Sequence, residues 1–230
     1  MRKVRDTLRV MPRPLRTIVA NQCYHVINRG NQKARVFHSE HDYSAFLAVM
    51  NEAQERVLLP VLAACLMPNH IHLVVQPLGK SDLSAWMSWM LTTFVRRQHQ
   101  KYSGTGRLWQ GRYKAFHIQQ DHHLLAVLRY VERNALSAHL VTRAEHWRWG
   151  SLHWRALPAP PVAMAPLPIP LPGYWPEFVN QPMTAAELRE IRICVNRQRP
   201  FGAQEWVETC AKDFGTECSL SPRGRPRRSR

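Results

Sequence analysis

The chain has 230 residues and a formal charge of +16, from 32 lysines and arginines against 16 aspartates and glutamates. This balance predicts a polyanionic partner, foremost a nucleic acid; an anionic membrane surface is disfavoured because no long amphipathic helix with a lysine-rich face is present. No apolar run is long enough to span a membrane, and the five cysteines contain no C-x-x-C pair, which disfavours a zinc or redox protein and fits a reducing cytoplasm.

The first two thirds of the chain alternate between strand and helix patterns. In chain order the sequence predicts a strand over 23–28, a helix over 41–59, strands over 61–66 and 70–76, a helix over 81–102, a strand over 114–119 and a helix from 121 to about 139. The order β-α-β-β-α-β-α predicts an α+β fold: a ferredoxin-like antiparallel sheet with helices on one face and an extra helix. We expect the other face to be free for a ligand.

The chain is predicted to divide into five segments. Seven prolines among small apolar residues in 158–172 are typical of a stiff linker, and two helical patterns follow it. The predicted segments are a basic arm or misassigned start at 1–10, a main domain at 11–157, the linker at 158–172, a helical DNA-binding appendage at 173–218 and a disordered arginine-rich tail at 219–230.

Two histidines stand one residue apart in MPNHIHL, residues 67–73. Successive side chains of a strand point to opposite faces, so His70 and His72 would project side by side, as a pair of metal ligands would. Apolar neighbours such as Ile71 and Leu73 favour a central strand. Taken alone, the pair fits a solvated hairpin edge better than a metal site, and two imidazoles are an incomplete set of metal ligands.

The helix LLAVLRYVERNALSAHL, residues 124–140, presents a second pair of polar groups. An apolar stripe recurs at helical spacing through Leu124, Leu128, Val131 and Ala135. Tyr130 and Asn134 lie four residues apart on a neighbouring face, so a hydroxyl and an amide are presented together. A half-buried tyrosine beside a surface asparagine is the alternative interpretation.

Taken in order, MPNHIHL, RLWQGRY at 107–113 and LRYVERN at 128–134 resemble the REP-associated tyrosine transposases, and YHVINRGN at 24–31 is similar to that family's first strand and turn. The resemblance covers about residues 11–155. It implies membership of the histidine–hydrophobic–histidine endonuclease superfamily. It also implies a bacterial cytoplasmic, nucleoid-associated enzyme that acts on single-stranded or hairpin DNA of repetitive extragenic palindromes (REP). No obligatory protein partner is implied, and a monomer or a homodimer would serve.

Matched position by position, the family pattern implies a divalent-metal site. His70 and His72 match two metal ligands, Asn134 matches the third, and Tyr130 matches the nucleophile. The ion implied is Mg²⁺ or Mn²⁺. Attack by Tyr130 on the scissile phosphate would give a 5′-phosphotyrosine and a free 3′-hydroxyl, which allows strand transfer without ATP.

Arginines and aromatics are expected to hold the DNA. Tyr113 is a rival nucleophile, but it lacks a helical amide partner, and we assign its segment to base stacking and phosphate contact; core packing is the alternative for Trp109. The R-G-R-P run at 223–226 resembles the minor-groove clamp of AT-hook proteins, with general phosphate affinity as the alternative. The predicted DNA-contacting residues are Arg29, Arg107, Trp109, Arg112, Tyr113, Lys114, Arg129, Arg223, Arg225, Arg227 and Arg228.

Two departures from the family pattern leave activity open. Ala135 stands where a proline commonly follows the asparagine, and FHIQQ at 116–120 replaces a segment that often carries proline and acidic residues. The predicted function is therefore a metal-dependent single-strand endonuclease and strand transferase. The alternative is a catalytically inactive regulator that binds the same hairpins on the same scaffold.

Overall fold

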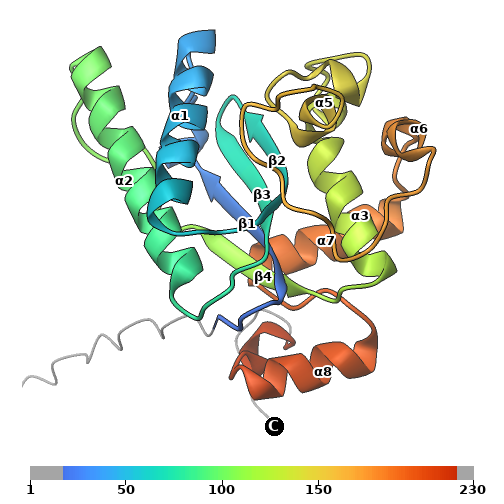
Figure 1. Ribbon diagram of the computed structural model, residues 1–230. Coiled ribbons are helices and arrows are strands. Elements are labelled where there is room, and N and C mark those ends of the chain that lie inside the picture. The colour runs from blue at the N-terminus through green and yellow to red at the C-terminus, as the bar shows by residue number, and fades with distance from the viewer. Residues whose placement is uncertain (1–17, 222–230) are drawn as a thin grey trace, which may run out of the picture.

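The computed structural model describes residues 18–221, and Figure 1 shows their arrangement. The strands are β1 (Cys23–Arg29), β2 (Val61–Met67), β3 (His70–Val75) and β4 (Lys114–Ile118). The longer helices are α1 (Glu40–Arg56), α2 (Asp82–Tyr102), α3 (His122–Glu132), α7 (Ala185–Arg197) and α8 (Gln204–Asp213). The short helices are α4 (Asn134–Ser137), α5 (Ser151–Trp154) and α6 (Trp175–Asn180), with single 3₁₀ turns at Asn31–Lys33, Ala144–His146 and Glu217–Ser219.

The four strands form one antiparallel sheet in the order β2-β3-β1-β4. β2 and β3 are joined by a tight turn at Pro68 and Asn69. β1 lies between β3 and β4, with Ile27 opposite both His72 and Lys114. This order confirms the predicted ferredoxin-like arrangement and places β3, with its two histidines, inside the sheet.

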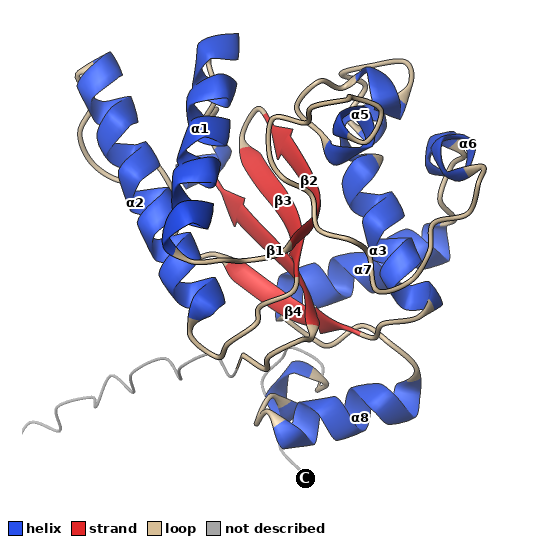
Figure 2. Cartoon of the chain, viewed as in Figure 1, coloured by secondary structure: helices blue, strands red, loops and turns tan. Residues whose placement is uncertain are grey.

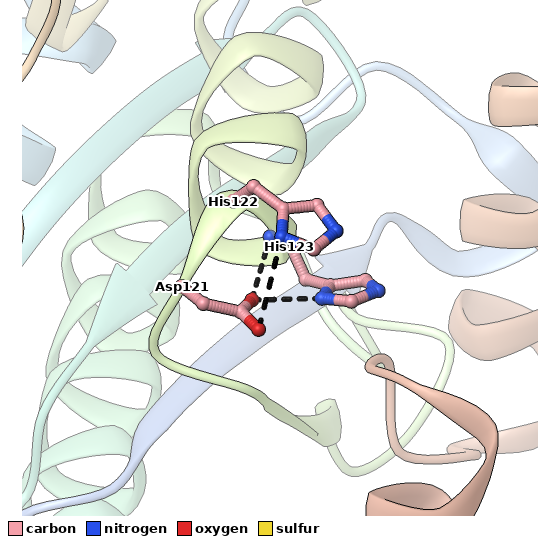
Figure 3. A group of neighbouring side chains, drawn as sticks. All are labelled: Asp121, His122 and His123. Atoms are coloured by element: carbon pink, nitrogen blue, oxygen red, sulfur yellow. Dashed lines mark hydrogen bonds and ion pairs between the residues drawn. The ribbon is translucent and has the colours of Figure 1, made fainter.

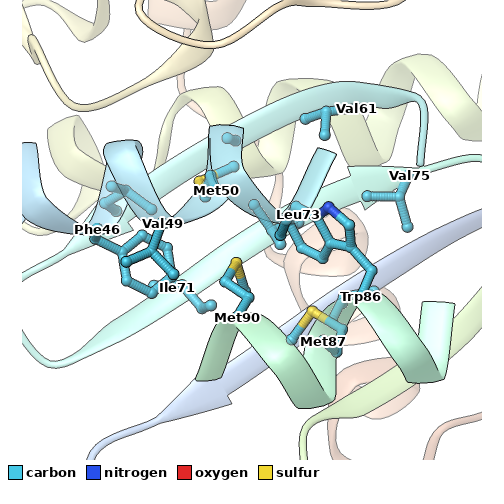
Figure 4. Packing of buried hydrophobic residues seen from close by; sticks show 14 of the residues in the cluster. Phe46, Val49, Met50, Val61, Ile71, Leu73, Val75, Trp86, Met87 and Met90 are labelled. Carbon is cyan, nitrogen blue, oxygen red and sulfur yellow. The ribbon is translucent and has the colours of Figure 1, made fainter. Parts of the chain in front are cut away.

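One face of the sheet packs against α1 and α2, which lie side by side in Figure 2. Their apolar stripes meet Ile71 and Leu73 of β3, as Figure 4 shows from close by. Phe46 of α1 and Trp86 of α2 are fully buried there. Burial of such side chains contributes about 1.5–3 kcal/mol each, so this layer is a major source of stability.

The opposite face is covered as well, which corrects the expectation of a free face. α3 lies on this face and contacts β2, β3 and β4, while α5 contacts β2 and α7 contacts β4 (Figure 2). All four members of the predicted apolar stripe are fully buried: Leu124, Leu128 and Val131 on α3, and Ala135 on α4. The apolar positions of the strands alternate onto both faces, so a second helical layer is needed to remove them from water.

A side-chain hydrogen bond caps the N-terminus of α3 but not that of α2. Asp121 begins α3 as predicted, because its carboxylate accepts a hydrogen bond from the His123 backbone N–H at 2.8 Å. Ser81 makes no side-chain capping bond to α2. The Asp82 carboxylate instead accepts from the Gly79 N–H, at 2.5 Å, and holds the turn before the helix.

The proline-rich segment and the helices after it pack against the main domain. Val162 is buried, and the Ala165 N–H donates to the Val61 carbonyl at 2.9 Å. Trp175 of α6 is also buried and donates through Nε1 to the Glu132 carboxylate, at 2.6 Å. Phe201, between α7 and α8, bridges to Ile118 at the end of β4. Within residues 18–221, no helix is long and apolar enough to cross a membrane.

Candidate active site

His70 and His72 lie side by side on β3, with ring centroids 4.8 Å apart. The His72 ring is 1% exposed and His70 is half-buried. His70 Nδ1 lies 2.6 Å from the side-chain oxygen of Asn69, in the turn before the strand. Hydrogen bonds to neighbouring strands on both sides fix the backbone of β3, so the two rings project from a rigid element.

Tyr130 of α3 and Asn134, the first residue of α4, lie beside these histidines. The helix predicted from 121 to about 139 is broken at Arg133 into these two helices. The rings of His72 and Tyr130 meet edge-on, with centroids 5.6 Å apart at 89°. The Asn134 side chain hydrogen-bonds both His70 and the Tyr130 hydroxyl. The structure thus brings together the four residues that the sequence predicted as metal ligands and nucleophile, from segments about sixty residues apart.

A third histidine, His25 of β1, belongs to the same group and was missed in the sequence. Its Nε2 lies 2.8 Å from Nδ1 of His72, the ring is fully buried, and its Nδ1 has no partner among the described residues. Strand alternation places His25 on the same face as Arg29. Only the register, with Ile27 opposite His72, makes His25 a diagonal neighbour of His72.

Burial keeps the three imidazoles neutral. It lowers the pKa of His25 to about 3, helped by the nearby His70. Burial, together with the charge of Arg29, lowers the pKa of His70 to about 4, against the weaker opposing effect of a hydrogen bond to the Asn134 side chain. Burial and the neighbouring His70, His25 and Arg29 hold the pKa of His72 well below its ordinary value. Neutral imidazole is the form that binds a metal ion, so the donor set fits a divalent ion at neutral pH.

The pKa of the Tyr130 hydroxyl is subject to opposing effects. Burial raises its pKa, whereas the hydrogen bond from Asn134 and the positive charges of Arg192 and Arg29 lower it, and the net shift is upward. Arg192 lies on α7, far along the chain, and the sequence contained no signal for its place beside Tyr130. The site therefore combines a half-buried phenol with two cationic groups of the kind that bind phosphate.

A different group of possible metal ligands lies at the start of α3, where Figure 3 shows Asp121, His122 and His123. One ligand atom from each lies within 4.8 Å of the others. Asp121 is already engaged, because it accepts from both the backbone N–H and the Nδ1 of His123. The carboxylate thus caps the helix, and seven residues, about 10 Å of helix, separate His123 from Tyr130.

Two predicted base-stacking residues are buried in the core. Trp109 is 7% exposed and contacts Phe46 and Phe94, and Tyr113 is 6% exposed with its hydroxyl 3.2 Å from Ser84 Oγ. Both rings belong to the hydrophobic core, so core packing is the correct interpretation for Trp109, and Tyr113 is buried in the same core. Their burial instead fixes the loop that carries Arg107 and Arg112 and leads into Lys114 at the start of β4, all three exposed.

Arg129 also departs from its predicted role in DNA contact. Its side chain is 4% exposed, donates to the carbonyls of Gln181 and Pro182 and lies 4.0 Å from the Phe178 ring. It therefore joins α3 to the segment between α6 and α7. Arg29, by contrast, is half-buried beside the histidines. The tail residues Arg223, Arg225, Arg227 and Arg228 lie outside the described residues.

The chain matches the family model described as "Transposase IS200 like" over residues 18–134. A protein of Haemophilus influenzae assigned as a REP-associated tyrosine transposase is 27% identical over 124 residues, which cover 49% of this chain and 70% of the relative.

Among solved structures, a REP-associated tyrosine transposase bound to a REP hairpin matches with a TM-score of 0.52 and 15% identity, over 62% of this chain and 84% of the other. A Deinococcus radiodurans protein assigned as a transposase matches with a TM-score of 0.38 and 17% identity, over 53% of this chain and 96% of the other. The family match spans β1 to Asn134 and so contains all four predicted site residues, and the first solved structure shares the fold. The chain therefore belongs to the IS200-like transposase family and is similar to its REP-associated tyrosine members.

Proposed function

We propose that this transposase cuts and rejoins single DNA strands through a covalent bond to Tyr130. The observation that carries the proposal is the contact between the two elements of the site. The Asn134 amide bonds both His70 and Tyr130, and the Tyr130 ring lies against His72. A nucleophile and a set of neutral metal-binding groups are thereby held around one point.

His70, His72 and Asn134 would hold the divalent ion that the family implies, Mg²⁺ or Mn²⁺. Bound there, the ion would polarise the scissile phosphate and neutralise charge that develops on its oxygens. The imidazoles are neutral, and His25 holds His72 through Nδ1, which leaves Nε2 of His72 for coordination. Nitrogen and amide-oxygen donors accept several divalent ions, so metal preference is a matter for experiment.

The covalent step forms one bond and breaks another at the same phosphorus. The Tyr130 oxygen bonds to phosphorus and loses its proton, while the bond from phosphorus to the 3′-oxygen breaks and that oxygen takes up a proton. The product is a 5′-phosphotyrosine and a 3′-hydroxyl, and attack by a new 3′-hydroxyl reverses the step. Arg29 and Arg192 favour the deprotonated phenol and attract the phosphate.

We propose hairpin DNA of the REP type as the substrate. Two findings support this choice: a relative is assigned as a REP-associated tyrosine transposase, and the solved structure that shares the fold is a REP-associated transposase bound to a REP hairpin. The charge of +16 adds general affinity for the phosphate backbone.

The proposal is tested with a labelled hairpin oligonucleotide that carries single-stranded ends, incubated with the protein and Mg²⁺ or Mn²⁺. We expect a covalent adduct that survives SDS. It should not form when EDTA is present from the start, and it should not form with Tyr130→Phe. Tyr113→Phe is the matched control and should keep the adduct, because its hydroxyl lies in the core against Ser84. Adduct formation by Tyr130→Phe would disprove the assignment of the nucleophile.

A binding protein without catalysis is the second candidate. One observation favours it: burial outweighs the hydrogen bond and the two arginines, so the net pKa shift of Tyr130 is upward, which opposes ionisation. The same experiment separates the candidates. Tight hairpin binding without an adduct in either metal would establish the second. If instead His70→Ala and His72→Ala abolish the adduct but retain hairpin affinity, the enzyme is established.

A further inference from the structure

A pocket of about 270 Å³ opens beside the candidate active site, between the end of β1, the loop before β4 and α7. Its lining residues are Ile27, Asn28, Arg29, Gln110, Gly111, Arg112, Tyr113, Lys114, Val195, Asn196 and Gln198. The family match ends at residue 134, whereas α7 begins at 185. One wall of this pocket therefore comes from a part of the chain that the family match does not include.

The pocket adjoins the catalytic group through two arginines. Arg29 lines the pocket and lies directly opposite His70 in the register of β1 and β3. Its charge also lowers the pKa of Tyr130. Arg192 acts on Tyr130 from α7, one helical turn before Val195 and Asn196 of the pocket wall. A strand whose phosphate lies at Tyr130 would thus continue directly into the pocket.

Two buried polar groups in the wall have no protein partner. Asn28 is 4% exposed; its side-chain oxygen accepts from the Arg29 N–H at 3.0 Å, but its amide nitrogen has no partner. Nε of Arg29 is buried and unpartnered as well. An unpaired buried donor costs about 1–3 kcal/mol, and an acceptor from a ligand would recover that cost.

The walls are held in place by the surrounding structure. Trp109 anchors the loop in the core, and the Gln110 N–H donates to the Arg29 carbonyl at 2.8 Å. On the other side, Ile191 and Cys194 of α7 are buried against the sheet, so that Asn196 is carried on a fixed helix. The pocket is a built feature rather than a gap between mobile segments.

The chemistry of the walls matches one nucleotide. Arginine and lysine side chains suit phosphate, and asparagine and glutamine amides pair with base edges, because each offers both a donor and an acceptor. The volume of about 270 Å³ lies just below the range of ordinary small-ligand pockets, which starts at roughly 300 Å³, so the pocket is too small for a duplex.

We propose that this pocket binds one unpaired nucleotide of the DNA strand next to the scissile phosphate, and that Asn196 of α7 reads its base. The inference rests on the proposed function, because it assumes that the strand runs past Tyr130. It makes the C-terminal part of the chain a determinant of where the strand is cut.

The test measures binding in EDTA, so that no cleavage is needed. Hairpin oligonucleotides with a single-stranded extension are compared with versions that carry one abasic nucleotide at each extension position in turn. We expect one position, at the foot of the hairpin, at which base removal weakens binding by about tenfold. Asn196→Ala should bind the intact extension about tenfold more weakly than the wild type does. Removing the base at that position should not lower the affinity of this variant further.

Asn196→Asp provides a second variant of almost the same size. It exchanges a donor for an acceptor, so the base preferred at that position should change among the four bases. Gln204→Ala removes an exposed amide from α8, outside the pocket, and should bind every oligonucleotide as the wild type does.

Three results would overturn the inference. The first is an abasic profile of Asn196→Ala that matches that of the wild type. The second is a wild-type affinity that no abasic position lowers. The third is a paired extension that binds as tightly as an unpaired one. In each case the covalent adduct at Tyr130 is measured separately. An intact adduct with a flat abasic profile rejects the pocket alone, whereas a missing wild-type adduct rejects the proposed function.

Discussion

At the scale of single residues, the site depends on a histidine that contacts no proposed substrate atom. His25 is fully buried, and its Nε2 lies 2.8 Å from Nδ1 of His72. A group in this position fixes the orientation and tautomer of a metal-binding imidazole. His25 is thus a positioning residue, and its effect should reach the metal through His72.

We expect His25→Ala to raise the Mn²⁺ concentration needed for half-maximal adduct formation by about 10- to 100-fold, because His72 loses its partner at Nδ1. Titration of Mn²⁺ against the initial rate measures this. His25→Gln can still hydrogen-bond and should recover part of the loss. His117→Ala removes another buried histidine, which bonds Tyr24 on β1, and serves as the control. An equal loss in both variants would mean that His25 acts only on stability.

At the scale of elements, helix positions are secured by buried carboxylates. Glu132, two residues after Tyr130, accepts from Ser151, Arg155 and Trp175 at 2.6–2.9 Å. Asp42 in the first turn of α1 accepts from the His38 and Ser39 N–H groups and pairs with Lys101 of α2 at 2.7 Å. Glu132 holds the nucleophile helix, and Asp42 holds the two helices of the opposite layer together.

Asp42 should make the free energy of unfolding depend on pH in the acidic range. Its burial raises the pKa, but the hydrogen bonds from Lys101, Tyr102 and the backbone outweigh burial and hold the pKa well below its ordinary value. Because the pKa of Asp42 is lower in the folded state than in the unfolded chain, its carboxylate stabilises the folded state at pH values above its unfolded-state pKa of about 4. This contribution is lost as the pH falls further.

We expect Asp42→Asn to lower the free energy of unfolding by about 1–3 kcal/mol at pH 7, measured by urea denaturation, and the difference from wild type to shrink below about pH 4. Glu52→Gln removes an exposed ion pair with Arg97 and should change the free energy by less than about 1 kcal/mol. A difference for Asp42→Asn that stays constant with pH would contradict the role of the charge.

At the scale of the whole molecule, the C-terminal part is packed into the same body as the sheet. Val162 belongs to the core beneath α1 and α2, while Trp175, Val179 and Ile191 belong to the core on the opposite face. Arg129 and Glu132 of α3 both bond to groups after residue 150. We infer that the nucleophile helix needs this part of the chain to stay in place.

Removal of 158–230 should therefore prevent folding or yield aggregated protein, because it exposes both cores and leaves Glu132 buried without Trp175. Trp175→Phe is the milder variant: it keeps the apolar bulk but loses the bond to Glu132, and should cost about 1–3 kcal/mol of unfolding free energy. Circular dichroism and thermal melts measure both. A soluble, cooperatively melting fragment 1–157 would show that the main domain folds alone.

The sequence by itself predicted the main elements, their order and the four residues that the structure groups at the candidate site. Alternation and helical spacing are local properties, so they predicted β1 to β4 with small errors at the ends and the buried stripe of α3 and α4, but not the break between these two helices at Arg133. The order of elements and the resemblance then predicted the sheet and the group of His70, His72, Tyr130 and Asn134. The same local reasoning failed for Arg129 and Trp109, because charge and aromaticity do not tell whether a side chain faces water or the core.

Only the tertiary structure decided which distant groups complete the site. His25 reaches His72 through the strand register, and Arg192 reaches Tyr130 because α7 folds back onto the sheet. The second helical layer likewise follows from the need to bury the apolar side chains on both faces of the strands. Register and the return path of the chain depend on the packing energy of the whole molecule, which no local pattern contains.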